Sequence, residues 1–157
     1  KGSVFAFYFP AAEHKLRTDE SGAGAPMLVC TGQRVLYVDD EEALVFLASR
    51  VLTRLGYRVS SFTDPVAALE AFRAHPQDYD VVVTDMSMPQ LSGLHFAREV
   101  LSVRAGMPVV MTTGYIGAED EERARAAGIR DLILKPVTMD ELGRLLERVL
   151  RDTQAHH

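Results

Sequence analysis

Short apolar runs alternate along the chain with longer segments in which apolar residues recur every three or four positions. The short runs are rich in valine and other β-branched residues, which is typical of buried strands. The longer segments have the spacing of amphipathic helices. The predicted strands are 34–38, 57–62, 80–84, 108–112 and 130–134. The predicted helices are 41–55, 65–75, 91–103, 117–127 and 138–151, so a strand-helix unit is repeated five times.

Local signals support these helices. Asp64 followed by Pro65 supplies an N-cap with proline at the first helical position. Gly56 and Gly128 lie where helices are expected to stop. Two apolar stripes predict the buried helix faces: Ala43, Leu44, Leu47, Val51 and Leu55 in the first helix, and Leu142, Leu145, Leu146 and Val149 in the last. We expect both stripes to pack against the core.

The strands have valine on both faces, as in Val81 to Val83. This pattern predicts a parallel sheet that is covered by helices on both sides. Because connections between parallel strands are right-handed, the five units predict an α/β, doubly wound sandwich of three layers.

Polar side chains follow four of the predicted strands. They are Asp39 and Asp40 after the first strand, Asp85 after the third, Thr112 and Thr113 at the end of the fourth, and Lys135 after the fifth. The carboxyl ends of parallel strands form one edge of the sheet, where open α/β folds bind ligands. Taken singly, an aspartate after a strand is more often a helix cap. The joint occurrence of acids, hydroxyls and an amine at successive strand ends favours a functional site.

Composition narrows the class of partner. The chain has 157 residues with a formal net charge of −5, which argues against binding to nucleic acid or to anionic membrane and favours protein partners. No apolar stretch reaches the ~20 residues of a spanning helix, so we expect no direct membrane contact. The single cysteine, Cys30, cannot form an internal disulfide, which fits a cytoplasmic location.

Four motifs in this order, VDDEE, TDMSMPQLSG, TTGY and LKP, resemble the receiver domain of two-component response regulators. The resemblance covers residues 33–152. It implies a flavodoxin-like sheet of five parallel strands in the order 2-1-3-4-5, with five helices. It also implies a phosphoacceptor module, whose own phosphorylation and dephosphorylation are the reactions that it catalyses.

The resemblance assigns a role to each residue of the site. Asp85 would be the phosphoacceptor, assisted by Thr113 and Lys135, which bind phosphoryl oxygens. A cluster of carboxylates that receives an anionic group needs a divalent cation, and Mg²⁺ prefers such oxygen ligands. By resemblance, Asp40 binds Mg²⁺ directly, Asp39 acts through water, and Asp85 and the carbonyl of Ser87 complete the protein ligands. The peptide bond before Pro136 is expected to be cis.

Three further positions near the predicted site have their own expectations. Leu132 stands where many receivers have an aromatic residue that moves inward on phosphorylation, so the aromatic switch is in doubt. Tyr115 is expected near the path of the water that attacks the aspartyl phosphate, where it either slows dephosphorylation or is an exposed loop residue without a kinetic role. Gly114 would leave room for the phosphoryl group to enter.

The first 13 residues alternate like a strand and resemble the last strand of a histidine-kinase ATP-binding domain. Residues 14–32 are predicted to be a linker, and 153–157 a tail. This order predicts the C-terminal receiver of a hybrid sensor histidine kinase, with a transmitter or phosphotransfer domain as partner and a homodimer as a further possibility. Three alternatives remain: a freestanding single-domain response regulator, a pseudo-receiver that binds partners without phosphorylation, and an aspartyl phosphatase. The phosphatase is disfavoured because Ser87 stands where a second aspartate is needed.

Overall fold

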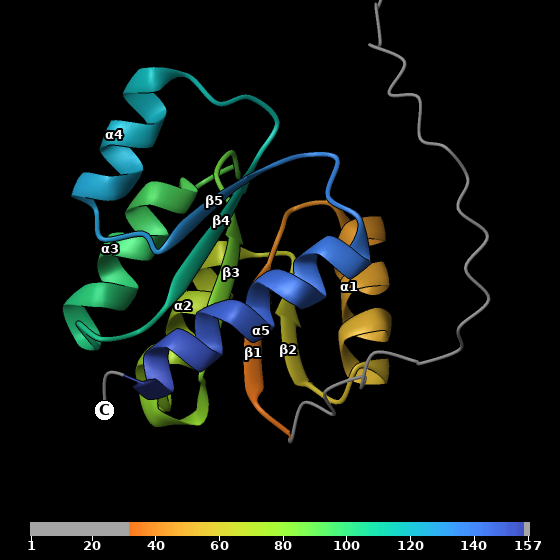
Figure 1. Ribbon diagram of the computed structural model, residues 1–157. Helices are drawn as coiled ribbons and strands as arrows, with labels where there is room; N and C mark the ends of the chain where they lie inside the picture. Colours follow the sequence, from red (N-terminus) through yellow and green to blue (C-terminus); the bar gives the residue numbers. More distant parts are fainter. Residues whose placement is uncertain (1–31, 156–157) are drawn as a thin grey trace, which may run out of the picture.

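The computed structural model describes residues 32–155, in which strands and helices alternate (Figure 1). The strands are β1 (Arg34–Val38), β2 (Arg58–Phe62), β3 (Val81–Asp85), β4 (Val109–Thr113) and β5 (Asp131–Leu134). The helices are α1 (Glu42–Arg54), α2 (Pro65–Ala74), the 3₁₀ turn η1 (Pro76–Asp78), α3 (Gly93–Val103), α4 (Ala118–Ala126) and α5 (Met139–Ala155). The strand predicted within 1–13, and the linker except for its last residue, lie outside the described residues. No helix in the described part is long and apolar enough to cross a membrane.

All five strands are parallel and lie in the order β2-β1-β3-β4-β5, which confirms the predicted flavodoxin-like sheet. β1 lies between β2 and β3, so the chain reverses direction across the sheet next to β1. Such a reversal leaves a crevice at the carboxyl ends of the central strands. The fold thus provides a place for a site before any side chain is considered.

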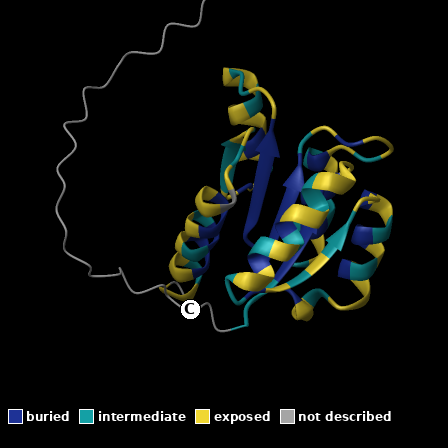
Figure 2. Cartoon of the chain, turned by 90° about the vertical axis from the view of Figure 1, so that its right-hand side faces the viewer, coloured by how far each residue is buried: buried dark blue, intermediate teal, exposed yellow. Residues whose placement is uncertain are grey.

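Helices cover both faces of the sheet. One core cluster joins α2, α3 and α4 to residues such as Leu36 and Val82, and its largest side chains include Phe72 and Phe96. The other joins α1 and α5 to the opposite face of β1, β3 and β4. In Figure 1, α5 crosses one face of the sheet beside α1, and Figure 2 shows buried strands between partly exposed helices. Strands with two buried faces explain the continuous valine runs.

The buried face of α1 differs from the predicted stripe. Ala48 and Leu52 are fully buried, with Val45 and Leu55 packed beside them. Leu47, which the stripe placed in the core, is 45% exposed. The helix contains two overlapping apolar rows, and periodicity alone does not say which one faces the sheet. The stripe predicted for α5 is confirmed, since all four of its residues pack in the core cluster of that face.

The helix ends follow the predicted chemistry. The Asp64 carboxylate accepts hydrogen bonds from two backbone N–H groups of α2, and Gly56 and Gly128 have positive φ after α1 and α4. At the start of α5, the Glu141 carboxylate accepts hydrogen bonds from the backbone N–H and the hydroxyl of Thr138, and this holds the pKa of Glu141 below its usual value. α5 continues to Ala155, four residues beyond its predicted end, so the first three residues of the predicted tail are helical.

Candidate functional site at the carboxyl edge of the sheet

Strand ends bring the predicted site residues to one edge of the sheet. Asp85 and Thr113 are the last residues of β3 and β4, one position beyond the predicted strand ends. Asp39 and Lys135 directly follow β1 and β5. Asp39, Asp85 and Thr113 are all at most 6% exposed, so their polar atoms depend on protein partners rather than on bulk water.

Three carboxylates form the centre of the site. Each of Asp39, Asp40 and Asp85 offers an oxygen within 4.8 Å of the others. Burial raises the pKa of Asp85, Lys135 lowers it, and the charges of Asp39 and Asp40 raise it further, so the net pKa of Asp85 lies above its usual value. The cluster therefore holds negative charge at a cost that a bound cation would relieve.

Lys135 bridges two of these acids. Its Nζ lies 2.9 Å from Asp39 Oδ2 and 3.1 Å from Asp85 Oδ1. Burial acts to lower the pKa of this ammonium, but hydrogen bonds to both carboxylates and their charges outweigh it, so the pKa is raised. The peptide bond from Lys135 to Pro136 is cis, as predicted. Lys135 is thus held as a cation against Asp85. The same ammonium also joins the end of β5 to Asp39, which lies 96 residues earlier in the sequence.

Asp39 and Asp40 have different environments. The Asp39 carboxylate accepts one hydrogen bond from Lys135 and another from the backbone N–H of Glu41, at 2.9 Å. Asp40 is exposed, and no hydrogen bond to another described residue uses its carboxylate. Asp40 therefore has both oxygens available for a ligand, whereas the oxygens of Asp39 already have protein partners. This difference fits the direct role predicted for Asp40 and the indirect role predicted for Asp39.

The Thr113 hydroxyl is hydrogen-bonded to the loop that follows β4. Its hydroxyl donates to the carbonyl of Tyr115 at 2.8 Å, and the N–H of Tyr115 lies 3.3 Å from the same oxygen. The hydroxyl also lies 3.5 Å from the sulfur of Met86. To bind a ligand at Asp85, Thr113 must give up its bond to the Tyr115 carbonyl. The Tyr115 side chain is 73% exposed, and an added side chain at Gly114 would meet no atom within 4 Å.

The loop after β3 is held close to Asp85. Gly93 donates a hydrogen bond to the carbonyl of Met86 at 2.9 Å. A Cβ at Gly93 would lie 2.1 Å from the carbonyl oxygen of Asp85, so glycine is required there. Ser87 lies in this loop with an exposed side chain, and the role predicted for its carbonyl stays a prediction.

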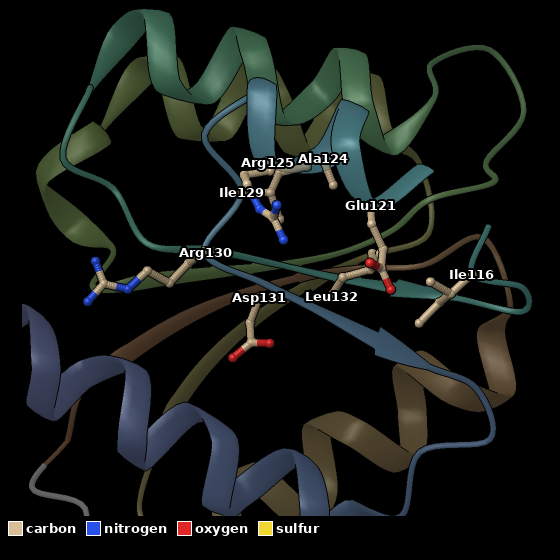
Figure 3. Close-up of a pocket in the computed structure, with 8 residues that line it drawn as sticks. All are labelled: Ile116, Glu121, Ala124, Arg125, Ile129, Arg130, Asp131 and Leu132. Atoms are coloured by element: carbon tan, nitrogen blue, oxygen red, sulfur yellow. The ribbon is translucent and has the colours of Figure 1, made fainter. Parts of the chain in front are cut away.

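Leu132 lines a hollow of about 350 Å³ between α4 and β5. Figure 3 shows Leu132 on the same side of β5 as Ile116 and Glu121, while Asp131 points away toward α5, where it pairs with Arg148. No aromatic side chain lines this hollow among the described residues. The lining combines aliphatic side chains with charged ones such as Glu121 and Arg125. Position 132 thus offers leucine, and no ring, to this space.

Sequence reasoning missed two contributors. The backbone N–H of Glu41 fixes the orientation of Asp39, a role that its position at the start of α1 could have suggested. Tyr37 is 4% exposed and lies beneath the acids, where burial and then the charges of Asp39 and Asp85 hold its pKa well above the usual value. No sequence signal separates Tyr37 from an ordinary apolar core residue of β1.

Comparison with known proteins decides the family. The family model of the response regulator receiver domain matches residues 35–147. The chain belongs to this family. The match spans β1 through most of α5 and includes every residue of the predicted site. The chain is thus a receiver domain of two-component systems.

Curated relatives include both sensors and regulators. The chain is 29% identical to the sensor protein EvgS of Escherichia coli over 90% of its length, and 35% identical to the virulence sensor protein BvgS of Bordetella pertussis over 82%. It is 34% identical over 76% of its length to the probable transcriptional regulatory protein TcrX of Mycobacterium tuberculosis. It spans 12%, 11% and 50% of these relatives, respectively.

Solved structures agree with the fold. A response regulator receiver domain protein from Clostridium thermocellum superposes with a TM-score of 0.75 at 26% identity, covering 80% of this chain and 99% of that one. The receiver domain of the sensor histidine kinase PA1611 from Pseudomonas aeruginosa gives a TM-score of 0.68 at 29% identity, covering 76% and 98%. That structure has a magnesium ion coordinated in its active-site cleft.

Proposed function

We propose that this receiver accepts a phosphoryl group from a phosphohistidine onto Asp85. The observation that carries the proposal is the placement of Asp85, which lies among two other carboxylates and 3.1 Å from the Lys135 ammonium. An Asp85 oxygen would attack phosphorus, so that a P–O bond forms while the P–N bond to histidine breaks and its electron pair returns to the imidazole nitrogen. Hydrolysis, or transfer to a phosphotransfer histidine, would then release the group.

The acids fit Mg²⁺ as the resident cation. Carboxylate oxygens are ligands that this ion prefers, and Asp40 and Asp85 would hold it directly, with Asp39 supporting it and the Ser87 carbonyl completing the protein ligands. When bound, the ion supplies positive charge that lowers the repulsion between the acids and an incoming phosphoryl group. The magnesium ion in the PA1611 receiver supports this assignment.

Lys135 and Thr113 would bind the phosphoryl oxygens. Lys135 already lies against Asp85, so its ammonium needs only to shift from carboxylate to phosphoryl oxygen. Thr113 would exchange its hydrogen bond to the Tyr115 carbonyl for one to the phosphoryl group, which frees the β4–α4 loop to move. With Leu132 in β5, this loop would carry the structural change without an aromatic partner.

The parent of this receiver would be a hybrid sensor histidine kinase. The match to EvgS covers 90% of the chain and extends beyond residues 35–147 of the family match, which supports relatedness to sensors outside the receiver itself. The partner would be a transmitter or a phosphotransfer domain in the cytoplasm, not nucleic acid. A freestanding regulator is the second candidate, favoured by the similarity to TcrX. The mixed charges on α4, β5 and α5 leave a homodimer as a further proposal.

Intact mass after incubation with acetyl phosphate tests this function. We expect a labile, magnesium-dependent gain of one phosphoryl group in the wild type and none in Asp85→Ala. Asp120→Ala, which changes a partly exposed aspartate in the first turn of α4, outside the cluster of Asp39, Asp40 and Asp85, is the matched control and should be phosphorylated normally. Failure of the folded wild type to gain a phosphoryl group, also in a rapid-turnover assay, would favour the pseudo-receiver.

A further inference from the structure

A second hollow of about 370 Å³ lies on the α1 and α5 side of the sheet, behind Lys135. Its walls are Leu44 of α1, Leu142 of α5, Val137 of the β5–α5 connection, and Tyr37 and Thr112 of the central strands. The volume is within the range of about 300–1,000 Å³ that is usual for small-molecule sites. The lining is mainly apolar.

Two hydroxyl groups in this hollow have no protein partner. Tyr37 and Thr112 are each 4% exposed, and within residues 32–155 neither side chain makes a hydrogen bond. Among the described residues, neither oxygen belongs to the fully enclosed side-chain atoms that lack a hydrogen bond, so both hydroxyls are accessible from the hollow. Since both residues line the same hollow, a molecule bound there could satisfy them together.

The charges around the hollow favour an uncharged ligand. Lys135 is the charged residue among its lining side chains, and its ammonium is already bonded to Asp39 and Asp85. An anionic ligand would meet this acidic cluster without a cation to pair with. A cationic ligand would find no carboxylate in the lining and would lose its hydration.

We propose that this hollow binds a neutral, mainly apolar small molecule that carries a hydrogen-bonding group, such as an aromatic alcohol or a nitrogen heterocycle, and that its binding changes phosphoryl transfer at Asp85. The ligand contacts Lys135 and Val137, which lie on the connection that holds the ammonium against Asp85. The proposed binding is inferred from the shape and lining of the hollow and does not depend on the proposed function. The effect on phosphoryl transfer rests on the proposed function.

Indole is a suitable probe, since it is neutral and apolar with one N–H donor. We expect titration of the ¹⁵N-labelled protein with indole to give saturable shifts confined to the hollow, with a dissociation constant of about 1 mM or lower. Tyr37→Phe should weaken binding about two- to tenfold through the lost hydrogen bond. Tyr79→Phe, a matched change on the opposite face of the sheet, should bind as the wild type does.

Val137→Phe should fill the hollow and abolish indole binding. If this variant does not fold, Tyr37→Phe still decides the question. Shifts scattered over the surface, or affinity unchanged in the folded variants, would overturn the proposal. So would a wild type that does not bind indole while Val137→Phe selectively blocks transfer from a phosphotransfer domain, because the hollow would then belong to a protein partner.

The regulatory step has its own measurement. Saturating indole should change the rate of phosphorylation by acetyl phosphate at least about twofold in the wild type and not in Val137→Phe. Binding without a rate change would overturn the regulatory step. If Asp85 is never phosphorylated although indole binds at the hollow, the proposed function fails and the binding site stands.

Discussion

The two ends of the sheet differ in how their charged side chains are paired. At the amino end, the backbone N–H of Arg34 donates to Asp80 at 2.7 Å, and its guanidinium pairs with Asp78 at 3.0 Å. Arg104 donates to the carbonyls of Pro76 and Tyr79 at 3.1 and 2.6 Å. Each arginine here joins segments that are far apart in the sequence. The polar groups of this edge therefore stabilise the fold.

At the carboxyl end, Asp39, Asp40 and Asp85 gather around Lys135, which pairs with two of them. Burial and the neighbouring charges raise the pKa of Asp85, so its ionised form is disfavoured in the folded state. Stability alone would not select this arrangement. The polar groups of the amino edge are thus paired in ways that stabilise the fold, whereas the carboxyl edge concentrates acidic charge, which fits the proposed site for a cation and a phosphoryl group.

The largest effect is expected for Asp85→Asn, which removes the proposed phosphoacceptor and lowers the repulsion among the carboxylates at the carboxyl edge. Phosphorylation should fall to background, and the thermal midpoint at pH 7 should rise by a few °C. Because the folded pKa of Asp85 is raised, the wild type loses stability as pH rises through that pKa. The gain in stability of Asp85→Asn over the wild type should therefore be full at pH 7 and become smaller toward pH ~4.

Denaturant unfolding at several pH values, read beside intact mass, checks this prediction. A variant that is less stable than the wild type at pH 7 would contradict the comparison of the two edges.

The next effect tests the amino edge. Arg104→Ala removes a charged donor from two carbonyls and should lower the free energy of unfolding by about 2 kcal/mol, with phosphorylation unchanged. Arg73→Ala is the control, since it removes an exposed ion pair with Glu99 and should cost less than about 1 kcal/mol. Urea titrations measure the free energy of unfolding of both variants. Equal losses would show that Arg104 stabilises the fold no more than an exposed ion pair does.

Magnesium should stabilise the carboxyl edge specifically. At about ten times its dissociation constant, Mg²⁺ should raise the free energy of unfolding by about 1.4 kcal/mol. Asp40→Asn should lose most of this gain, and Asp120→Asn should keep it. Thermal scans with magnesium chloride, against sodium chloride of equal ionic strength, give the comparison. A gain that survives in Asp40→Asn would place the cation elsewhere.

The smallest effect concerns the loop that closes the carboxyl edge. The Tyr115 side chain is exposed and its backbone carbonyl binds the Thr113 hydroxyl, and we expect the ring to hinder the water that attacks the aspartyl phosphate. Tyr115→Ala should shorten the phosphoryl half-life by a few-fold, with Tyr79→Phe as a control. Following loss of the phosphoryl mass over time measures the half-life. An unchanged half-life would leave Tyr115 without a kinetic role.

Much of the site was predictable because its residues occupy strand ends. The apolar runs before Asp39, Asp85, Thr113 and Lys135 predicted the strands, and parallel strands bring their carboxyl ends to one edge. Asp64, Gly56 and Gly128 ended or began helices as expected, because capping depends on local backbone geometry. The strand order 2-1-3-4-5 came from the resemblance and not from these local patterns.

Other features depended on contacts between distant residues. The buried face of α1 was predicted correctly at Leu55 and wrongly at Leu47. The predicted row is as regular as the row through Ala48 and Leu52, and only packing on the sheet selects between them. The direct metal-binding role of Asp40 and the water-mediated role of Asp39 were likewise expectations from the resemblance. Its support in this structure comes from Lys135 and from the backbone of Glu41.

The sequence by itself determined the alternation of strands and helices and the chemistry at each strand end, because both depend on residues that are neighbours in the chain. The tertiary structure decided which face of α1 is buried, that Lys135 bridges Asp39 and Asp85, and that Tyr37 and Thr112 share a hollow without protein partners. Those features arise from side chains that meet only after the sheet has formed. Their energies depend on burial and on distances between atoms, which no local pattern contains.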